Sequence, residues 1–342
     1  MNLRFFNKLM IIAAASCIFC LNTQCSNEEK VTPSENSTVE TPDPPASNES
    51  SNYVVAYLVA GEYVANAVRW HALTHLCVAF IYPREDGTIS DKAIAGNIRS
   101  IVDEAHRNNK KVLISIRDEV KGDFAGALLN NKTKLADNLL DYVEKNNLDG
   151  FDIDFEDWSA TDVVTHLIRF SKELYQRKGE KLIQSCAVNT WDQGYTTEWH
   201  KYYDIINVMA YDQHGPWNTE GQHSPYNESI ESIIFWRDKM EAPAEKLVLG
   251  VPFYGYSWNE GDEKGQAYRY RQILEKYPDI DVASRDQIDR LYYNGKATIL
   301  KKCKWVKENK IKGIMIWQIF QDATDKNDSL LEAIGTTMLG EE

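Results

Sequence analysis

The chain alternates between short apolar runs and longer segments with helical periodicity. Eight runs rich in Val, Ile, Leu and aromatic residues predict buried strands; they span 54–59, 76–82, 111–116, 150–155, 182–188, 205–210, 247–252 and 313–317. Amphipathic helical patterns lie between them, for example at 94–106, 133–146, 163–177, 229–240, 297–308 and 329–338. Strands that alternate with helices predict βα units and a parallel sheet.

Eight such repeats predict an α/β fold of the (β/α)8 barrel type, in which catalytic residues lie at the carboxyl ends of the strands. An open doubly wound sheet is the alternative, but it is disfavoured by the number of repeats and by the absence of a glycine-rich nucleotide fingerprint. We expect one barrel domain over residues 52–342. The 55 residues at 258–312 leave no room for a full α+β insertion between strands seven and eight, only for a remnant of one.

The fourth predicted strand separates acidic from apolar side chains. Its alternation places three acids on one face and three apolar residues on the other: Asp152, Asp154 and Glu156 against Phe151, Ile153 and Phe155. Neighbouring acids on one face lie roughly 6.6 Å apart, and their repulsion is on the order of 2.5 kcal/mol. We therefore expect at least one of them to hold a proton near neutral pH, which suits general acid catalysis. A calcium loop would place glycine and turn residues between its acids.

Motifs on three strands carry a resemblance to a known family. The spacing D-G-x-D-x-D-x-E at 149–156 resembles the signature of the family 18 glycoside hydrolases, the chitinase family. Residues 209–212 (MAYD) resemble the family's M-x-Y-D motif, and the His-Gly-x-Trp at 214–217 is often found in chitinases. Trp317, at the end of the eighth strand, matches the family's indole floor beneath the sugar. The resemblance spans nearly the whole barrel.

The resemblance implies a retaining mechanism in which the substrate's own 2-acetamido group attacks the anomeric carbon. Glu156 would protonate the leaving oxygen and later activate water. Asp154 would hydrogen-bond the acetamido N–H and stabilise the positive charge, Asp152 would share a proton with Asp154, and Tyr211 would hold the acetamido oxygen. The resemblance assigns the rest of the substrate pocket to Met209, Asp212, Trp317, Tyr57 and Phe80, and it implies cis peptides at 79–80 and 317–318.

The third strand departs from the family pattern. Family members usually carry Ser-x-Gly-Gly here, whereas this chain has Ser115, Ile116, Arg117 and Asp118. Arginine and aspartate in place of glycines put bulk and charge near the rim of the expected cleft. This departure concerns the shape of the groove more than the catalytic step.

Composition restricts the classes of partner and cofactor that we expect for this chain. A formal net charge of −13 argues against nucleic acid or another polyanion and favours a neutral substrate. We expect Cys77, Cys186 and Cys303 to be free buried thiols, and we expect no metal or other cofactor. The remaining histidines show no ligand spacing, and Lys301, Lys302, Cys303 and Lys304 suggest a solvated helix face.

The N-terminus is typical of a secreted lipoprotein. A basic start and a short apolar run predict a signal over 1–25 with lipidation at Cys25, although Cys17 competes and an ordinary cleaved signal is the alternative. Residues 26–51 are rich in Ser, Thr, Glu and Pro and predict a disordered tether. These features predict a monomer anchored by lipid to a bacterial membrane, at the outer-membrane surface or in the periplasm.

Three functions remain open at this stage. The first is a chitinase-like endo-hydrolase of β-1,4-linked N-acetylglucosamine polymers. The second is an endo-β-N-acetylglucosaminidase that trims N-glycans, which the altered third strand favours. The third is a non-catalytic protein that binds N-acetylglucosamine. Peptidoglycan as the substrate is not decided by the sequence.

Overall fold

A computed structural model describes residues 52–157, 162–191 and 194–340. Eight parallel strands form a ring in the order β1-β13-β8-β7-β6-β5-β4-β2, and the pairing of β1 with β2 closes it. The strands are β1 (Tyr53–Val59), β2 (His75–Pro83), β4 (Lys111–Ile116), β5 (Gly150–Asp154), β6 (Ile183–Val188), β7 (Ile205–Val208), β8 (Leu247–Pro252) and β13 (Gly313–Trp317). The predicted (β/α)8 barrel is confirmed, and the open doubly wound sheet is excluded because the ring is closed.

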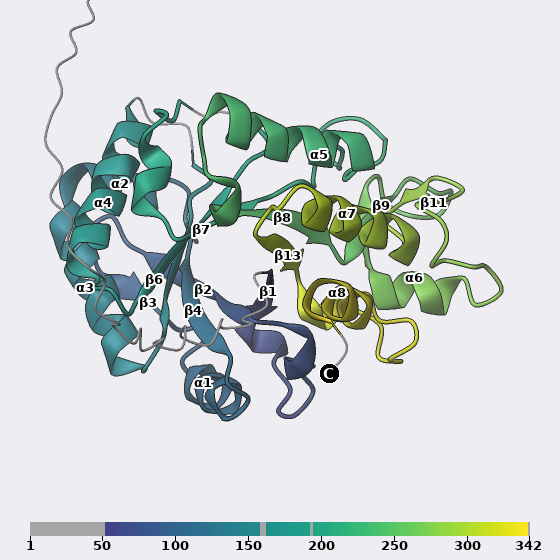
Figure 1. The fold of residues 1–342 in the computed structure, drawn as a ribbon, viewed down its shortest axis with the longest axis horizontal. Helices are drawn as coiled ribbons and strands as arrows, with labels where there is room; N and C mark the ends of the chain where they lie inside the picture. The colour runs from purple at the N-terminus through teal and green to yellow at the C-terminus, as the bar shows by residue number, and fades with distance from the viewer. Residues whose placement is uncertain (1–51, 158–161, 192–193, 341–342) are drawn as a thin grey trace, which may run out of the picture. The chain divides into compact units, whose positions relative to one another are not determined.

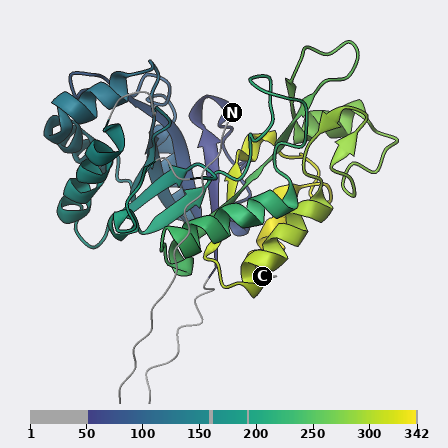
Figure 2. The same cartoon turned by 90° about the horizontal axis from the view of Figure 1, so that it is seen from above.

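Helices lie around the strands, as Figure 1 shows, and Figure 2 shows the same arrangement turned by 90°. They are α1 (Ile98–Arg107), α2 (Asp123–Asn130), α3 (Lys132–Lys145), α4 (Val163–Arg177), α5 (Tyr226–Ile234), α6 (Tyr270–Lys276), α7 (Lys296–Glu308) and α8 (Leu330–Leu339). Among the described residues, none of these helices is both long enough and apolar enough to cross a bilayer.

Alternation along each strand builds two apolar layers. On β1, Val54, Ala56 and Leu58 belong to the large core between the strands and the helices, whereas Val55 and Tyr57 belong to a smaller core inside the barrel. On β5 and directly after it, the same alternation sends Phe151, Ile153 and Phe155 outward, into the large core. Asp152 and Asp154 therefore point into the barrel, as predicted.

The prediction missed several short elements. Helix α2 was not expected, and α1 begins at Ile98, four residues later than the pattern suggested. Between β8 and β13 lies a four-stranded antiparallel sheet of β9 (Tyr254–Ser257), β10 (Gln266–Arg269), β11 (Gln287–Ile288) and β12 (Leu291–Tyr292), together with α6. This small sheet is the remnant allowed by the length of the segment, since it is far smaller than a separate domain. A short strand, β3 (Ile89–Ser90), pairs with the end of β2.

The start of β5 requires glycine because the neighbouring strand is too close for a side chain. A Cβ atom at Gly150 would lie 2.0 Å from the backbone oxygen of Ile183 on β6. The two strands could not keep their pairing around that atom. The glycine of the acidic motif is thus needed for β5 to pair with β6 in the barrel.

We expect Gly150→Ala to lower the free energy of unfolding by roughly 3 kcal/mol or more, because the added methyl group must push two paired strands apart. Urea denaturation of the two proteins measures the loss. Gly96→Ala is the control, since a Cβ there meets nothing within 4 Å, and its effect should stay within about 0.5 kcal/mol. Equal stability of the Gly150 variant and the unaltered chain would contradict the steric argument.

Candidate active site

A cavity of about 170 Å³ opens at the carboxyl ends of the barrel strands. The ends of β4, β5, β6 and β7 contribute to it, together with β1, β13 and the segment that follows β8. The described residues that line it are Tyr57, Arg117, Asp154, Glu156, Ala187, Asn189, Met209, Tyr211, Asp212, Tyr254 and Trp317. Seven of the residues predicted from the sequence are therefore gathered around one cavity, although they come from four strands far apart in the chain.

Asp152 lies beneath the cavity, fully buried among hydrogen-bond donors. Its Oδ2 accepts hydrogen bonds from Tyr57 Oη and Ser115 Oγ, both at 2.7 Å. Its Oδ1 accepts from Ser185 Oγ at 2.6 Å and from Asn207 Nδ2 at 3.5 Å. Burial raises the pKa of Asp152, and the hydrogen bonds from the surrounding donors oppose that rise. The serine kept in the altered third-strand motif is one of these donors.

Asp154 is the acid whose environment most favours the protonated form. It is 3% exposed. Burial first, then repulsion from Glu156 and Asp152, raises its pKa well above the usual value, and Arg117 acts in the opposite direction. Its Oδ1 is buried without a hydrogen-bond partner among the described residues. Buried polar atoms are rarely left unpaired, so this oxygen is suited to meet a polar group of a ligand.

Glu156 follows β5 and is the accessible member of the acidic row. Its side chain is 41% exposed, and its Oε1 lies 3.4 Å from Nη2 of Arg117. The guanidinium of Arg117 lies over the Phe80 ring, with its Cζ 5.3 Å from the ring centroid. The residue that replaces the family's glycine thus reaches the predicted general acid.

Aromatic rings form one wall of the cavity. Trp317 lines it directly, and Phe80 stacks behind the indole with a centroid distance of 5.8 Å and an interplanar angle of 20°. Tyr57 contacts Trp317 at 5.6 Å. The peptides Ala79–Phe80 and Trp317–Gln318 are both cis, as the family resemblance implied. Phe80 thus supports Trp317 from behind, whereas Tyr57 reaches the cavity itself.

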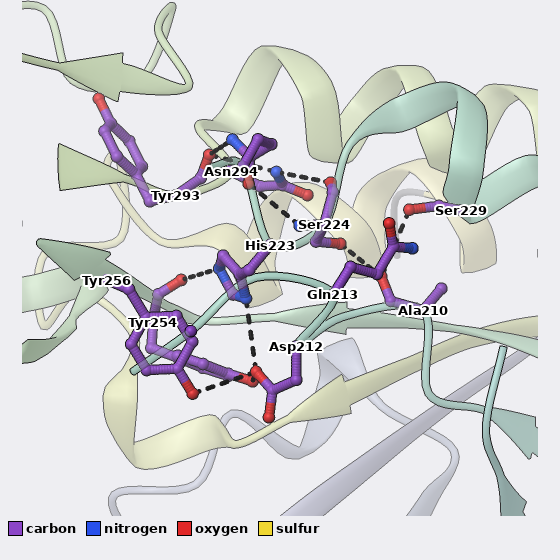
Figure 3. A network of polar contacts seen from close by, with 12 residues as sticks. Ala210, Asp212, Gln213, His223, Ser224, Ser229, Tyr254, Tyr256, Tyr293 and Asn294 are labelled. Atoms are coloured by element: carbon purple, nitrogen blue, oxygen red, sulfur yellow. Dashed lines mark hydrogen bonds and ion pairs between the residues drawn. The ribbon is translucent and has the colours of Figure 1, made fainter. Parts of the chain in front are cut away.

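The segment after β7 brings Tyr211 and Asp212 to the lining of the cavity. Burial first, then the nearby Asp154, raises the pKa of Tyr211 well above its usual value, so its hydroxyl stays available as a donor. Asp212 has a φ of 62°, in the left-handed region, and its Oδ1 accepts hydrogen bonds from Tyr254 Oη at 2.5 Å and Tyr256 Oη at 3.1 Å. The buried His223 places Nδ1 3.5 Å from the same oxygen (Figure 3).

The backbone on both sides of this dipeptide is held by residues 223 and 224. The backbone nitrogen of Gln213 donates to the carbonyl of His223 at 3.1 Å. The hydroxyl of Ser224 donates to the carbonyl of Ala210 at 2.6 Å, and both bonds belong to the network in Figure 3. Since a non-glycine residue in the left-handed region is strained, these bonds explain how Asp212 keeps its conformation.

Lys302 corrects one sequence-based expectation, because it is fully buried instead of solvated on a helix face. Its Nζ donates to the carbonyl oxygen of Ser224 at 2.9 Å, to Ser224 Oγ at 2.7 Å and to Asn294 Oδ1 at 2.7 Å. Burial lowers its pKa to about 7. The neighbouring Lys301 and Lys304 are exposed, as expected. Lys302 therefore anchors the segment that fixes the Tyr211–Asp212 backbone.

A second hollow of about 610 Å³ adjoins the cavity, and Asp212 borders both. Two of its lining residues are large exposed aromatics, Trp191 at 57% and Trp217 at 58% exposure. Exposed indole rings provide flat apolar surfaces. Trp217, in the His-Gly-x-Trp motif, is thus outside the inner cavity but next to it.

The comparisons with known proteins agree with this geometry. The sequence model described as "Glycosyl hydrolases family 18" matches residues 50–322. The chain is a member of glycoside hydrolase family 18.

Two solved structures show how close this family 18 chain is to chitinases. A chitinase from Bacteroides thetaiotaomicron has 33% sequence identity and a TM-score of 0.81, and the match covers 85% of this chain and 97% of that one. The chitinase ChiB from the chitin utilization locus of Flavobacterium johnsoniae has 30% identity and a TM-score of 0.73, covering 85% and 94%. This member of the glycoside hydrolase family is therefore chitinase-like.

A curated relative matches over a smaller part. A "chitinase-like effector" of Moniliophthora roreri is 24% identical over 260 residues, which is 67% of this chain and 64% of the relative. The match thus covers less than two thirds of the relative's length.

Some site features were not predicted from the sequence. Ser185, Asn207, Asn189 and Tyr254 were missed, although Ser185 and Asn207 carried a signal as polar residues on the inward parity of apolar strands. Cys77, Cys186 and Cys303 are buried free thiols, as predicted. Cys25 lies outside the described residues. Within those residues, no group of three or more His, Cys, Asp or Glu side chains is placed to hold a metal ion.

We expect Lys302→Met to lower the free energy of unfolding by about 2–4 kcal/mol, because the buried oxygens of Ser224 and Asn294 lose their donor. Urea denaturation measures the change. Lys304→Met is the control on the same helix, since Lys304 is 75% exposed and makes only a 3.8 Å contact with Glu308; we expect less than about 1 kcal/mol there. A Lys302 variant as stable as its control would show that the buried contacts contribute nothing.

Proposed function

We propose that this chain hydrolyses β-1,4 glycosidic bonds next to N-acetylglucosamine, with retention of configuration and with assistance from the substrate's acetamido group. The observation that supports this most directly is Asp154, which lines a cavity together with Glu156, Tyr211 and Trp317 and whose buried Oδ1 has no hydrogen-bond partner among the described residues. A buried carboxyl oxygen with no partner calls for a ligand N–H or O–H. The acetamido N–H of the sugar would supply it.

Glu156 is the proposed acid and base. It is the one accessible carboxyl group of the row, so a glycosidic oxygen in the cavity can reach it. It would protonate that oxygen as the bond breaks, and after the alcohol leaves it would take a proton from the attacking water. Two buried carboxyl groups and one accessible one suit this division of roles.

Asp154 and Tyr211 would orient the internal nucleophile. With Asp154 on the acetamido nitrogen and the Tyr211 hydroxyl on the carbonyl oxygen, that oxygen would be directed at the anomeric carbon to form an oxazolinium ion. Positioning of this kind contributes several kcal/mol to the barrier reduction. Asp154 would also stabilise the positive charge that develops, and Asp152, held by surrounding donors, would share a proton with Asp154.

The surroundings favour an oligomeric substrate cleaved within its chain. Trp317 offers a ring face for the sugar at the cleaved bond, and the adjoining hollow with Trp191 and Trp217 offers further apolar surface. Two relatives above 25% identity are chitinases by name, which supports chitin oligomers as the substrate. The adjoining hollow is the feature that favours endo cleavage.

An endo-β-N-acetylglucosaminidase is the second candidate. The observation that favours it is Arg117, which lines the cavity where chitinases usually carry glycine. A non-catalytic sugar-binding role is less well supported, because Glu156 and the groups around it are all retained.

The cell-surface setting is also a proposal. We propose that the chain is lipidated at Cys25, that residues 26–51 form a tether, and that the protein is a monomer in the cell envelope. These proposals would be tested by metabolic labelling with a fatty acid and by comparison with Cys25→Ala.

We expect Glu156→Gln to lower kcat on chitin tetrasaccharide by roughly a thousandfold, because the amide cannot donate an acidic proton. Binding of the same sugar, measured by calorimetry, should persist. Glu119→Gln is the control, since this exposed acid is paired with Arg84 outside the cavity, and its kcat should not change. An active Glu156 variant would reject the assignment.

A second expectation concerns the N-acetyl group. Fully deacetylated tetrasaccharide should not be cleaved, because glucosamine lacks the carbonyl oxygen that acts as nucleophile. Product analysis by mass spectrometry of acetylated and deacetylated substrates tests this, and partly acetylated chains should be cut only after an acetylated sugar. Equal cleavage of both tetrasaccharides would require a nucleophile from the protein instead.

A further inference from the structure

Arg117 has an unusual place for a cation in this chain. It follows β4, and its backbone nitrogen donates to Ile81 on β2 at 3.1 Å, which fixes the start of the side chain. The guanidinium lies over Phe80 and lines the cavity. Among the described lining residues it is the only lysine or arginine, and it stands beside Asp154 and Glu156.

Most N–H donors of the Arg117 guanidinium have no acceptor among the described residues. Arginine carries five N–H groups. Within the described part of the chain, the guanidinium of Arg117 makes one polar contact, the 3.4 Å approach to Glu156, and that distance is too long for a good hydrogen bond. Other arginines here are better matched: Arg269 binds both carboxyl oxygens of Glu62 at 2.9 Å. Packing against Phe80 covers one face of the Arg117 guanidinium and leaves its N–H edge for another partner.

The partner that best fits this edge is a carboxylate. A planar guanidinium binds a carboxylate through two parallel hydrogen bonds, which are stronger than bonds to neutral hydroxyl groups. The carboxyl groups nearby are not available in that way. Asp118 accepts from the backbone nitrogen of Phe124 at 2.7 Å, Asp154 favours its protonated form, and Glu156 is needed at the glycosidic oxygen.

We propose that Arg117 binds a carboxylate on one of the two sugars that flank the cleaved bond, so that the preferred substrate is an N-acetylglucosamine glycan with an acidic sugar at that point. Such a carboxylate would draw the guanidinium away from Glu156 and leave Oε1 free for the glycosidic oxygen. The inference rests on the proposed hydrolysis for the position of that bond.

The net charge of the chain limits how many negative charges a substrate is expected to carry. A formal charge of −13 disfavours a densely charged polymer, so recognition of one carboxylate beside the cleaved bond is expected instead of a long acidic surface. Two sources have this chemistry: a uronic acid, with its carboxylate on the sugar ring, and a sugar with a free lactyl ether, with its carboxylate on a side arm. Both are β-1,4-linked partners of N-acetylglucosamine.

The test compares each acidic tetrasaccharide with its own methyl ester, which has the same shape without the charge. One pair carries glucuronic acid and the other carries free-acid N-acetylmuramic acid; chitin tetrasaccharide is the neutral reference. For the unaltered full chain we expect kcat/KM and the calorimetric affinity to favour one acid over its ester roughly tenfold to a hundredfold. The pair that shows the preference identifies the source of the carboxylate.

Variants of Arg117 test whether this residue causes the preference for the acid over its ester. Arg117→Gln should bring the ratio of acid to ester close to one, and Arg117→Lys should keep part of it, since an ammonium retains charge without the planar fork. Arg84→Gln is the matched control: Arg84 is a neighbouring cation paired with Glu119 and Asp123 outside the cavity, so its ratio should equal that of the unaltered chain. A ratio near one in the unaltered chain for both pairs, or a ratio that Arg117→Gln leaves unchanged, would overturn the proposal.

The two proposals can fail separately. Cleavage of chitin tetrasaccharide together with a flat ratio would leave the hydrolase intact and reject the role of Arg117. Binding that follows the charge of the ligand and depends on Arg117, without cleavage of any substrate, would support this inference and reject the proposed hydrolysis.

Discussion

The burial of Asp152 at the centre of the barrel is the constraint on which the rest of the site depends. A carboxyl group with no exposed surface is costly unless donors surround it, and here the donors come from β1, β4, β6 and β7. Each of those strands must hold its register for the donors to converge. The same arrangement puts Asp154 one layer higher, where burial and the acids on either side favour its protonated form. The properties of the acids that line the cavity thus depend on a carboxyl group that lies beneath it.

The wall formed by Tyr211 and Asp212 depends on Tyr254, which also lines the cavity, and on residues outside it. Asp212 is held in a left-handed conformation by two tyrosine hydroxyls, and the backbone around it is tied to His223 and Ser224. Lys302, on α7, closes this support from outside the barrel. A fully buried lysine is rare in proteins, and the three oxygens that accept hydrogen bonds from Lys302 account for its burial.

The altered third-strand motif sets this chain apart from the glycine-containing pattern of its family. Ser115 keeps its place as a donor to Asp152, so the centre of the site is unchanged. Arg117 brings charge into the cavity, while Asp118 turns away to cap the start of α2. One departure in sequence therefore has two unrelated consequences, one for the site and one for the fold.

The strands, most helices and the acidic row were predictable from the sequence because they rest on local periodicity: alternation decides which face a strand residue takes, whatever the partner strand is. Helix α2 was missed because it is short and contains Gly126, which weakens the helical signal.

Lys302 was misjudged for a different reason. A lysine in a cluster of lysines resembles a solvated face, and only the approach of Ser224 and Asn294, 78 and 8 residues away in the chain, provides the oxygens that make its burial possible. The donors to Asp152, the contact of Arg117 with Glu156 and the unpaired oxygen of Asp154 were likewise decided by tertiary structure, because each depends on distances between strands that no local pattern encodes.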